Sequence, residues 1–283
     1  MKNIMKIGCI VLAALMCTMV LASCGNKQEL NFGKKYNPAD DQTNVLLQLN
    51  ASTIDVGVMD SIMAGYYMKQ DTTFSNSLMI IDGLTLAVEQ YGIGCRKGSG
   101  LAKMINTALI ELAKAGTVLE LATKYGIAAD LCIDTSVTVS ELTESEKADW
   151  EFVKNNGKFV VGYTLFAPIA YKNDANELVG FDIELAKAVA EYLELTVEFK
   201  LIKWDSKEIE LTAKTIDCIW NGMTINEERL EKMEMSIPYL NNTQVAVIRK
   251  ADAAKYKTTA DMADAIIGAE AGSAGEDVIV KSK

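Results

Sequence analysis

Histidine is absent from this chain of 283 residues. Without it the chain cannot form a Ser-His-Asp triad or a Cys-His pair, and it lacks the side chain that most often binds metals. Other residues can still act as acids and bases, so catalysis is disfavoured but not excluded. We expect no metal and no other cofactor.

A surplus of basic residues is also missing. The chain has 28 Lys and Arg against 38 Asp and Glu, which gives a formal net charge of −10. Because nucleic acid is bound by basic surfaces, we expect no nucleic-acid partner. Hydrophobic residues make up 49% of the chain, which is typical of a globular protein with one large or two ordinary domains.

Long apolar runs are confined to the N-terminus. Two lysines precede an apolar stretch over 7–21, and the string L-A-S-C comes at its end. A basic start, a short apolar stretch and small residues are typical of an export signal. The ending resembles a bacterial lipobox, so we expect residues 1–23 to be a lipoprotein signal peptide and Cys24 to carry lipid. The alternative is a transmembrane anchor, which the short run disfavours.

The cysteines form no zinc motif. Of the 6 cysteines, three lie at or before Cys24, and the others are Cys95, Cys132 and Cys218. These three cannot all pair with one another, and no C-x-x-C occurs. We expect them to be small core residues, with a Cys95–Cys218 disulfide as the alternative.

Strand-like and helix-like segments alternate after Cys24. Strands are predicted at 54–59, 90–95, 158–164, 195–202, 216–223, 242–250 and 266–269. Amphipathic helices are predicted at 101–127 and 180–193. This alternation predicts α/β layers with largely parallel sheets. Residues 128–149 are polar and are interpreted as a linker.

Two segments run from a strand through a glycine into a helix. In "IDCIWNGMTINEERLEK", Gly222 precedes Thr224 and a T-x-x-E capping box, and in "IIGAEAGSAGED" an S-x-x-E box begins at Ser273. Each can offer amides and a hydroxyl to an anion. Plain helix caps would give the same pattern. Arg229 lies about one turn past the first cap and can add a charged fork to a bound carboxylate.

Asp60 supplies a negative charge, because it ends a predicted strand and opens a helix. It is either an N-cap or an acceptor for an ammonium group at the carboxyl edge of a sheet. Two anion sites and one acid suit a zwitterion. Aromatic residues near the same edges either pack on its side chain or belong to the core: Tyr163, Phe166, Tyr171, Trp204 and Trp220.

Residues 158–250 resemble the first lobe of bacterial extracellular solute-binding proteins of family 3, the amino-acid receptors of ABC importers. The strings "LVGFDIELAKAVA" and "GMTINEER" carry this likeness. "IIGAEAGSAGEDVI" resembles the start of the second lobe, and "TIDVGVMDSIMAGYYM", "YGIGCRKG" and "ALIELAKAGTVLELATKYGI" resemble later parts of the family's sequence. The resemblance implies a two-lobed α/β fold of the periplasmic-binding-protein type II, with a ligand cleft between the lobes.

The order of these pieces is rotated relative to the family, which suggests a circular permutant. The strands missing after the final segment would then lie at the front of the chain. The alternatives are a rearranged gene, an assembly error, a fusion of two receptors, or a domain-swapped pairing between chains. The expected parts are the signal peptide 1–23, the second half of lobe 2 at 24–90, the C-terminal part of lobe 1 at 91–127, a linker 128–149 joining the family's usual termini, the main part of lobe 1 at 150–250 and the first half of lobe 2 at 251–283.

The resemblance also implies which residues hold the ligand's backbone groups. Arg229 and Thr224 would bind the α-carboxylate, together with Ser273 from the other lobe. The carbonyl of Gly222 and the carboxylate of Asp60 would bind the α-ammonium.

The ligand's side chain would lie between Phe166 and Trp204. Ala274 occupies a position where the family often has threonine. Binding of the ligand's carboxylate at this position would therefore depend on a backbone N–H and not on a hydroxyl. No acid lies near Thr164, which disfavours lysine or arginine as the ligand. Two neighbours on one strand are expected to shape the side-chain pocket: Trp220 and Asn221.

We therefore expect an extracytoplasmic, lipid-anchored monomer that captures an amino acid by closing its lobes and then docks on an ABC permease. One rival is an enzyme on the same fold, a dehydratase or lyase, which would need an acid or base beyond Asp60. Other rivals are a ligand-sensing ectodomain and a non-functional permuted receptor.

Overall fold

The computed structural model describes residues 32, 34–70 and 72–280. The expected signal peptide 1–23 and the lipid-attachment residue Cys24 lie outside the described residues. Among the helices that are described, none is both long enough and apolar enough to cross a membrane.

The secondary structure of the described chain alternates between strands and helices, as the sequence predicts. The strands are β1 (Lys35–Ala39), β2 (Val56–Asp60), β3 (Leu78–Arg96), β4 (Lys158–Tyr163), β5 (Tyr171–Lys172), β6 (Leu178–Val179), β7 (Thr196–Leu201), β8 (Cys218–Thr224), β9 (Met233–Met235), β10 (Leu240–Arg249) and β11 (Ile266–Glu270). The helices are α2 (Gln42–Asn50), α3 (Ser61–Gln70), α4 (Thr72–Ser75), α5 (Gly100–Lys114), α6 (Thr117–Lys124), α7 (Glu144–Asn156), α8 (Phe181–Tyr192), α9 (Lys207–Thr212), α10 (Glu227–Lys232) and α11 (Ala274–Val280).

One sheet runs through the described part of the molecule in the order β1-β11-β2-β10-β3-β8-β4-β7, and β9 pairs with β3. Strands β1, β11 and β2 are parallel, as are β8, β4 and β7. The long strands β10 and β3 join these two groups through antiparallel pairings. The predicted parallel sheet is therefore correct at each end and wrong at the centre.

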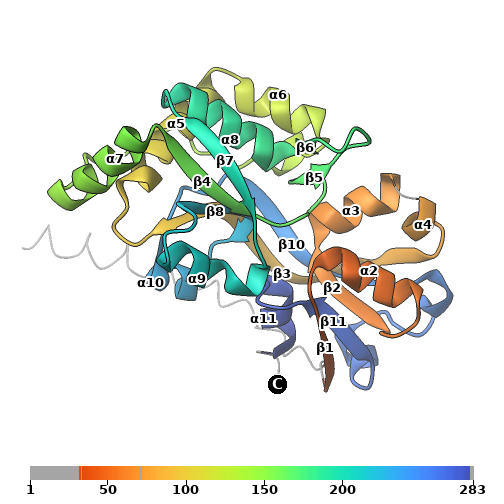
Figure 1. Cartoon of the computed structure of the whole chain (residues 1–283). Helices are drawn as coiled ribbons and strands as arrows, with labels where there is room; N and C mark the ends of the chain where they lie inside the picture. Colours follow the sequence, from red (N-terminus) through yellow and green to blue (C-terminus); the bar gives the residue numbers. More distant parts are fainter. Residues whose placement is uncertain (1–31, 33, 71, 281–283) are drawn as a thin grey trace, which may run out of the picture.

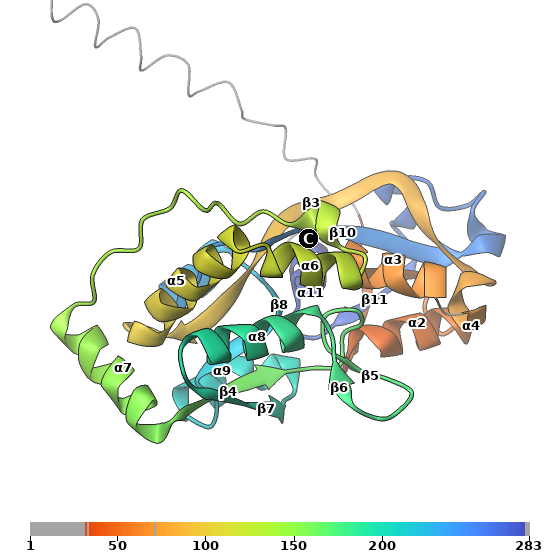
Figure 2. The same cartoon turned by 90° about the horizontal axis from the view of Figure 1, so that it is seen from above.

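The two parallel groups form the cores of two lobes (Figure 1). Lobe 1 contains β4, β7 and β8, with α5, α6 and α8 above them, and lobe 2 contains β1, β2 and β11, with α2 and α3 alongside. The view from above shows β3 and β10 running from one lobe into the other (Figure 2). A separate apolar cluster fills part of lobe 2, where Val58, Ala246 and Ile267 are almost fully buried. The expected two-lobed α/β architecture is confirmed.

The first and last described strands lie in the same sheet. Strand β11 sits between β1 and β2, with Ile267 in register with Tyr36 on one side and Val56 on the other. The neighbouring strands of the final segment are therefore β1 and β2, from the front of the described chain. Close packing supports this register, because a Cβ on Gly268 would approach Ile54 Cδ1 to 2.6 Å.

The predicted linker 128–149 is wrong at its C-terminal end. Helix α7 begins at Glu144, with Thr143 and Glu146 forming a reciprocal capping box. Glu146 also forms a 2.7 Å ion pair with Lys103 of α5. The polar composition masked this helix, although the capping box could have been found by its T-x-x-E spacing.

Candidate functional site

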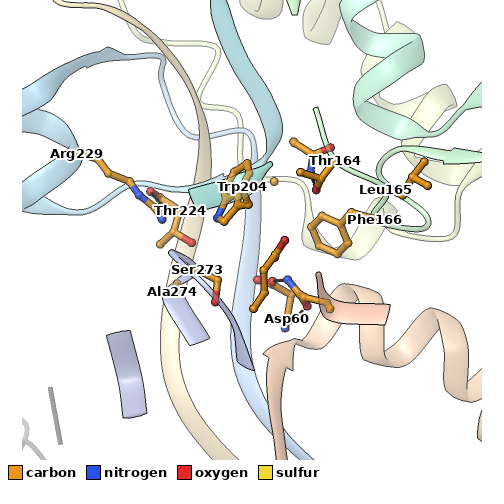
Figure 3. Close-up of a pocket in the computed structure, with 13 residues that line it drawn as sticks. Asp60, Thr164, Leu165, Phe166, Trp204, Thr224, Arg229, Ser273 and Ala274 are labelled. Atoms are coloured by element: carbon orange, nitrogen blue, oxygen red, sulfur yellow. Dashed lines mark hydrogen bonds between the residues drawn. The ribbon is translucent and has the colours of Figure 1, made fainter. Parts of the chain in front are cut away.

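One cavity between the lobes brings together the residues that the sequence singled out as ligand contacts. It is lined by residues of both lobes. Figure 3 shows these side chains converging on it. All eight predicted ligand contacts line this cavity: Asp60, Phe166, Trp204, Gly222, Thr224, Arg229, Ser273 and Ala274.

Arg229 is a buried cation in the lobe 1 wall of the cavity, with only 5% of its surface exposed. Its Nη1 donates a 2.7 Å hydrogen bond to the carbonyl oxygen of Thr224. This bond anchors the guanidinium group at the end of β8 and leaves other donors of the group for a ligand. A guanidinium presents five N–H donors in a planar fork, which suits a carboxylate.

The predicted capping box at Thr224 is wrong. Asn226 is the N-cap of α10, because its Oδ1 accepts a 2.8 Å hydrogen bond from the backbone N–H of Arg229. Strand β8 continues through Thr224, so the helix begins two residues later than that box would place it. The Thr224 hydroxyl instead donates to Glu89.

Asp60 is the acid of the lobe 2 wall, at the end of β2. Its Oδ1 accepts hydrogen bonds from the Tyr91 hydroxyl at 2.7 Å, Asn242 Nδ2 at 2.6 Å and Gln244 Nε2 at 2.9 Å. Burial raises the pKa of Asp60, although these donors favour its charged form. The N-cap interpretation is not supported, because the backbone N–H of Ile62 in α3 donates to Asn242 and not to Asp60.

A second buried acid, Glu89, lies behind the cavity wall. The side-chain amides of Asn242 and Gln244 donate to Glu89 Oε1 as well as to Asp60. Burial and the nearby charge of Asp60 raise the pKa of Glu89 to about 7. The two carboxylates therefore share their donors, and this wall is suited to a cationic group.

Gly222 has a backbone conformation that favours glycine, with φ of 62°. A Cβ at this position would lie 2.6 Å from Cε1 of Phe166. Its N–H donates a 2.8 Å hydrogen bond to the buried carboxylate of Asp182, and Tyr239 donates to the same oxygen. Asp182 thus holds the peptide between Asn221 and Gly222, which directly precedes the carbonyl of the predicted ammonium site.

Ser273 lies at the start of α11 and is 5% exposed. Its Oγ accepts a 3.2 Å hydrogen bond from the N–H of Glu276, as the predicted S-x-x-E box requires. The Glu276 carboxylate accepts a 2.6 Å hydrogen bond from the backbone N–H of Gly272. A capping box would instead use the N–H of Ser273, one residue later. The Ser273 hydroxyl hydrogen remains available to a group in the cavity.

The aromatic predictions divide between the cavity and the core. Phe166 and Trp204 line the cavity, as expected. Trp220 is fully buried, and it packs in the main apolar core, so its predicted role in the side-chain pocket is wrong. Side chains alternate along a strand, which places Trp220 on one face of β8 and Asn221 on the other. Tyr163 packs against Phe199 with a 6.2 Å separation of ring centroids.

Sequence reasoning missed three residues of the cavity wall, Gln42, Leu165 and Glu270. Gln42 opens α2, and its side-chain amide donates to Asp60. Glu270 ends β11, two residues before Gly272, and burial raises its pKa to about 8. Glu270 could have been predicted to line the cavity, because it lies at the end of a strand just before a glycine turn. No pattern in the sequence indicated such a position for Gln42.

Two contacts between described residues join the lobes. Lys207 of lobe 1 donates to the carbonyl oxygen of Gly272 at 3.0 Å. The rings of Tyr66 in α3 and Tyr171 in β5 lie 5.8 Å apart between centroids. The structure therefore describes the lobes in contact with one another.

The cysteines carry no disulfide in the described chain. Cys95 and Cys218 are register partners on β3 and β8, and both are buried free thiols. Cys132 is also free. The core interpretation of Cys95 and Cys218 is confirmed, whereas Cys132 is only partly buried.

One segment of the chain matches a known protein family. Residues 159–271 match the family model of bacterial extracellular solute-binding proteins, family 3. The resemblance to that family is therefore confirmed over these residues, which are less than half of the chain.

Relatives of the chain are named as amino-acid receptors. The L-cystine-binding protein TcyJ of Escherichia coli strain K12 is 31% identical over 126 residues, which are 44% of this chain and 47% of the relative. ABC transporter arginine-binding protein 1 of the same strain is 38% identical over 104 residues, or 37% and 42% of the two chains. A histidine-bound substrate-binding protein of Streptococcus pneumoniae is 41% identical over 30% of this chain and 35% of its own, with a TM-score of 0.29.

The match spans about half the length of the curated relatives. The matched family segment begins at β4 and ends just after β11. Residues 34–127, which complete lobe 2 and supply α5 and α6, lie outside it.

Proposed function

We propose that the protein is a substrate-binding protein of an ABC importer that captures an amino acid between its two lobes. The observation that carries this proposal is the meeting of a buried guanidinium, Arg229, and a buried carboxylate, Asp60, in the wall of one cavity. A zwitterion pairs its α-carboxylate with the first and its α-ammonium with the second. The relatives named as cystine- and arginine-binding proteins support the same class of ligand.

In this proposal each wall of the cavity holds one end of the ligand's backbone. Arg229, Thr224 and Ser273 bind the carboxylate, and an N–H near Ala274 adds a donor. Asp60 and the carbonyl of Gly222 bind the ammonium. Phe166 and Trp204 pack on the side chain. Since the contacts come from both lobes, binding favours the arrangement in which the lobes touch.

A melting-temperature screen of the signal-free protein against the common amino acids and cystine tests this function. A ligand at 100 times its Kd stabilises the folded state by about 2.7 kcal/mol, so a true ligand raises the midpoint clearly. If no amino acid shifts the midpoint, the proposal is wrong. If the best ligand is instead consumed, as monitored by mass spectrometry, the protein is an enzyme.

We also propose that the chain is a circular permutant of the family. The parallel pairing of β11 with both β1 and β2 supports this, because it joins the two ends of the chain in one lobe. On this proposal residues 24–90 and 251–283 form lobe 2, residues 91–127 and 150–250 form lobe 1, and 128–149 connect the family's usual termini.

A reordered chain tests the permutation. Residues 150–283 joined directly to 30–127 should give a monomer with the same ligand preference, as measured by calorimetry and light scattering. A reordered protein that folds but binds a different ligand, or none, would contradict the permutation. A dimer of the original chain would indicate pairing between chains instead.

The proposed location is the outer face of a bacterial cell membrane, with a lipid on Cys24 and an ABC permease as partner. The family's description as extracellular supports the location. The Cys24→Ala variant should move from the membrane fraction to the soluble fraction while keeping its ligand affinity. Retention in the membrane fraction would favour a membrane-spanning anchor.

A further inference from the structure

Glu270 carries an unsatisfied buried oxygen in the cavity wall. Its side chain is 5% exposed, and its Oε1 has no hydrogen-bond partner within the described residues. The residue lines the same cavity as Asp60 and Arg229. A buried carboxylate oxygen without a donor is costly, because it has lost its hydration and gained nothing in return. A ligand that brings a donor would remove this cost.

The neighbours of Glu270 do not neutralise it. Burial raises its pKa, the charges of Asp60 and Asp41 raise it further, and the Gln42 side chain and Lys207 act in the opposite direction. The Lys207 ammonium is directed at two carbonyl oxygens, those of Trp204 at 3.1 Å and Gly272 at 3.0 Å. Lys207 lowers the pKa of Glu270 through its charge, and two of its three N–H donors are directed at these carbonyl oxygens.

The acidic and basic groups that line the cavity are unequal in number. Its wall contains two acids, Asp60 and Glu270, and one base, Arg229. The α-carboxylate and α-ammonium of an amino acid would pair with Arg229 and Asp60, so Glu270 would have no partner among the ligand's backbone groups. A neutral side chain would leave this acid buried and unpaired, whereas a cationic side chain would balance the cavity.

We propose that Glu270 is a specificity-determining residue that accepts a hydrogen bond from a cationic side chain, so that the ligand is an amino acid with an ammonium or guanidinium group. This inference rests on the proposed function of the cavity. The sequence disfavoured lysine and arginine as ligands because no acid lies near Thr164. This inference replaces that expectation, since Glu270 of lobe 2 supplies the acid that would pair with a cationic side chain.

Calorimetric titrations with matched ligand pairs test the proposal. Arginine is compared with citrulline and lysine with norleucine, so that each pair differs in the charge of the side chain. The wild-type protein should prefer the cationic member of at least one pair by about tenfold or more, and Glu270→Gln should lose most of that preference. Asp205→Asn serves as the control, because it removes the same charge from a residue that does not line the cavity.

The possible outcomes distinguish the role of Glu270 from the proposed function of the cavity. A preference that persists in Glu270→Gln, or one lost equally in Asp205→Asn, would overturn the role of Glu270. A wild-type protein that binds only neutral amino acids would overturn this inference and leave the proposed function intact. A protein that binds no amino acid would overturn both. Melting of the unliganded variants shows whether each has folded, and if Glu270→Gln has not, the wild-type preference still decides the ligand class.

Discussion

The Nζ atom of Lys207 lies 3.0 Å from the carbonyl oxygen of Gly272, on the opposite lobe. The same ammonium donates to the carbonyl of Trp204 and lies 4.8 Å from the centre of its ring. Lys207 is 5% exposed, and this burial lowers its pKa to about 8. Lys207 thus joins Trp204, which lines the cavity, to the turn that precedes Ser273.

Replacing this lysine should weaken ligand binding, because the hydrogen bond to Gly272 exists only while the lobes touch. We expect Lys207→Met to reduce affinity by about 1–2 kcal/mol, mainly through faster dissociation. Lys203→Met is the control, since Lys203 is exposed on the preceding loop. Stopped-flow fluorescence of the ligand complex measures the dissociation rate. Equal rates in the two variants would show that the contact contributes nothing to closure.

Glycine should be required at position 222. A side chain there would have an unfavourable positive φ and would also clash with Phe166, so Gly222→Ala should destabilise the protein by roughly 2 kcal/mol or more. Gly65→Ala is the matched control, because no atom lies within 4 Å of its Cβ position in helix α3. That variant should be stabilised by about 0.4–1 kcal/mol. Denaturant unfolding compares the two, and equal effects would contradict this description of Gly222.

The buried carboxylate of Asp182 should make stability depend on pH. Burial raises its pKa from an ordinary value of 3.8 to about 7, so the folded state binds more protons than the unfolded state between these values. Its contribution to stability is therefore full below about pH 4 and is lost as the pH rises through 7. Asp182→Asn removes this dependence.

The prediction is a difference between two melting temperatures. The melting temperature of Asp182→Asn minus that of the wild type should be more positive at about pH 8 than at about pH 4.5. Other acids with a raised pKa, such as Glu89 and Glu270, are present in both proteins. Their effects on the melting temperature therefore largely cancel in the difference. A difference that stays constant over this range would show that the Asp182 carboxylate is charged in the folded protein throughout.

Strand and helix patterns predicted much of the fold and most of the site. The strand ends at Asp60 and Thr224, and the strand end that precedes Ser273, could be recognised because each joins an apolar run to a turn or helix signal. The antiparallel centre of the sheet could not be predicted, since the pairing of β3 with β10 depends on tertiary contacts and not on either strand alone.

Other features depend on partners that local patterns do not reveal. Trp220 and Asn221 are adjacent on β8, and only the packing of the sheet decides which one faces the cavity. The importance of Glu270 comes from an oxygen without a donor, which is a property of its surroundings and not of its residue type. Helix α7 was overlooked because its composition is polar, although its capping signal was present.

Arg229 should be essential for binding and dispensable for folding. Arg229→Ala should cost on the order of 2–5 kcal/mol of binding free energy, as expected for one partner of a buried charge pair. Lys232→Ala, on the exposed side of the same helix, removes a cation that pairs with Glu208 and Glu228 and should leave affinity unchanged. Calorimetry of both variants with the best ligand measures the difference, and near-normal affinity in Arg229→Ala would contradict the assignment.

The central claim is that Arg229 and Asp60 hold the two charged ends of one amino acid. It is tested most directly by titrating the wild type, Arg229→Ala and Asp60→Asn with the best ligand, with its methyl ester and with its deaminated analogue. We expect the wild type to reject both analogues, Arg229→Ala to lose discrimination against the ester alone, and Asp60→Asn to lose discrimination against the deaminated compound alone. Unchanged discrimination in both variants would contradict the claim.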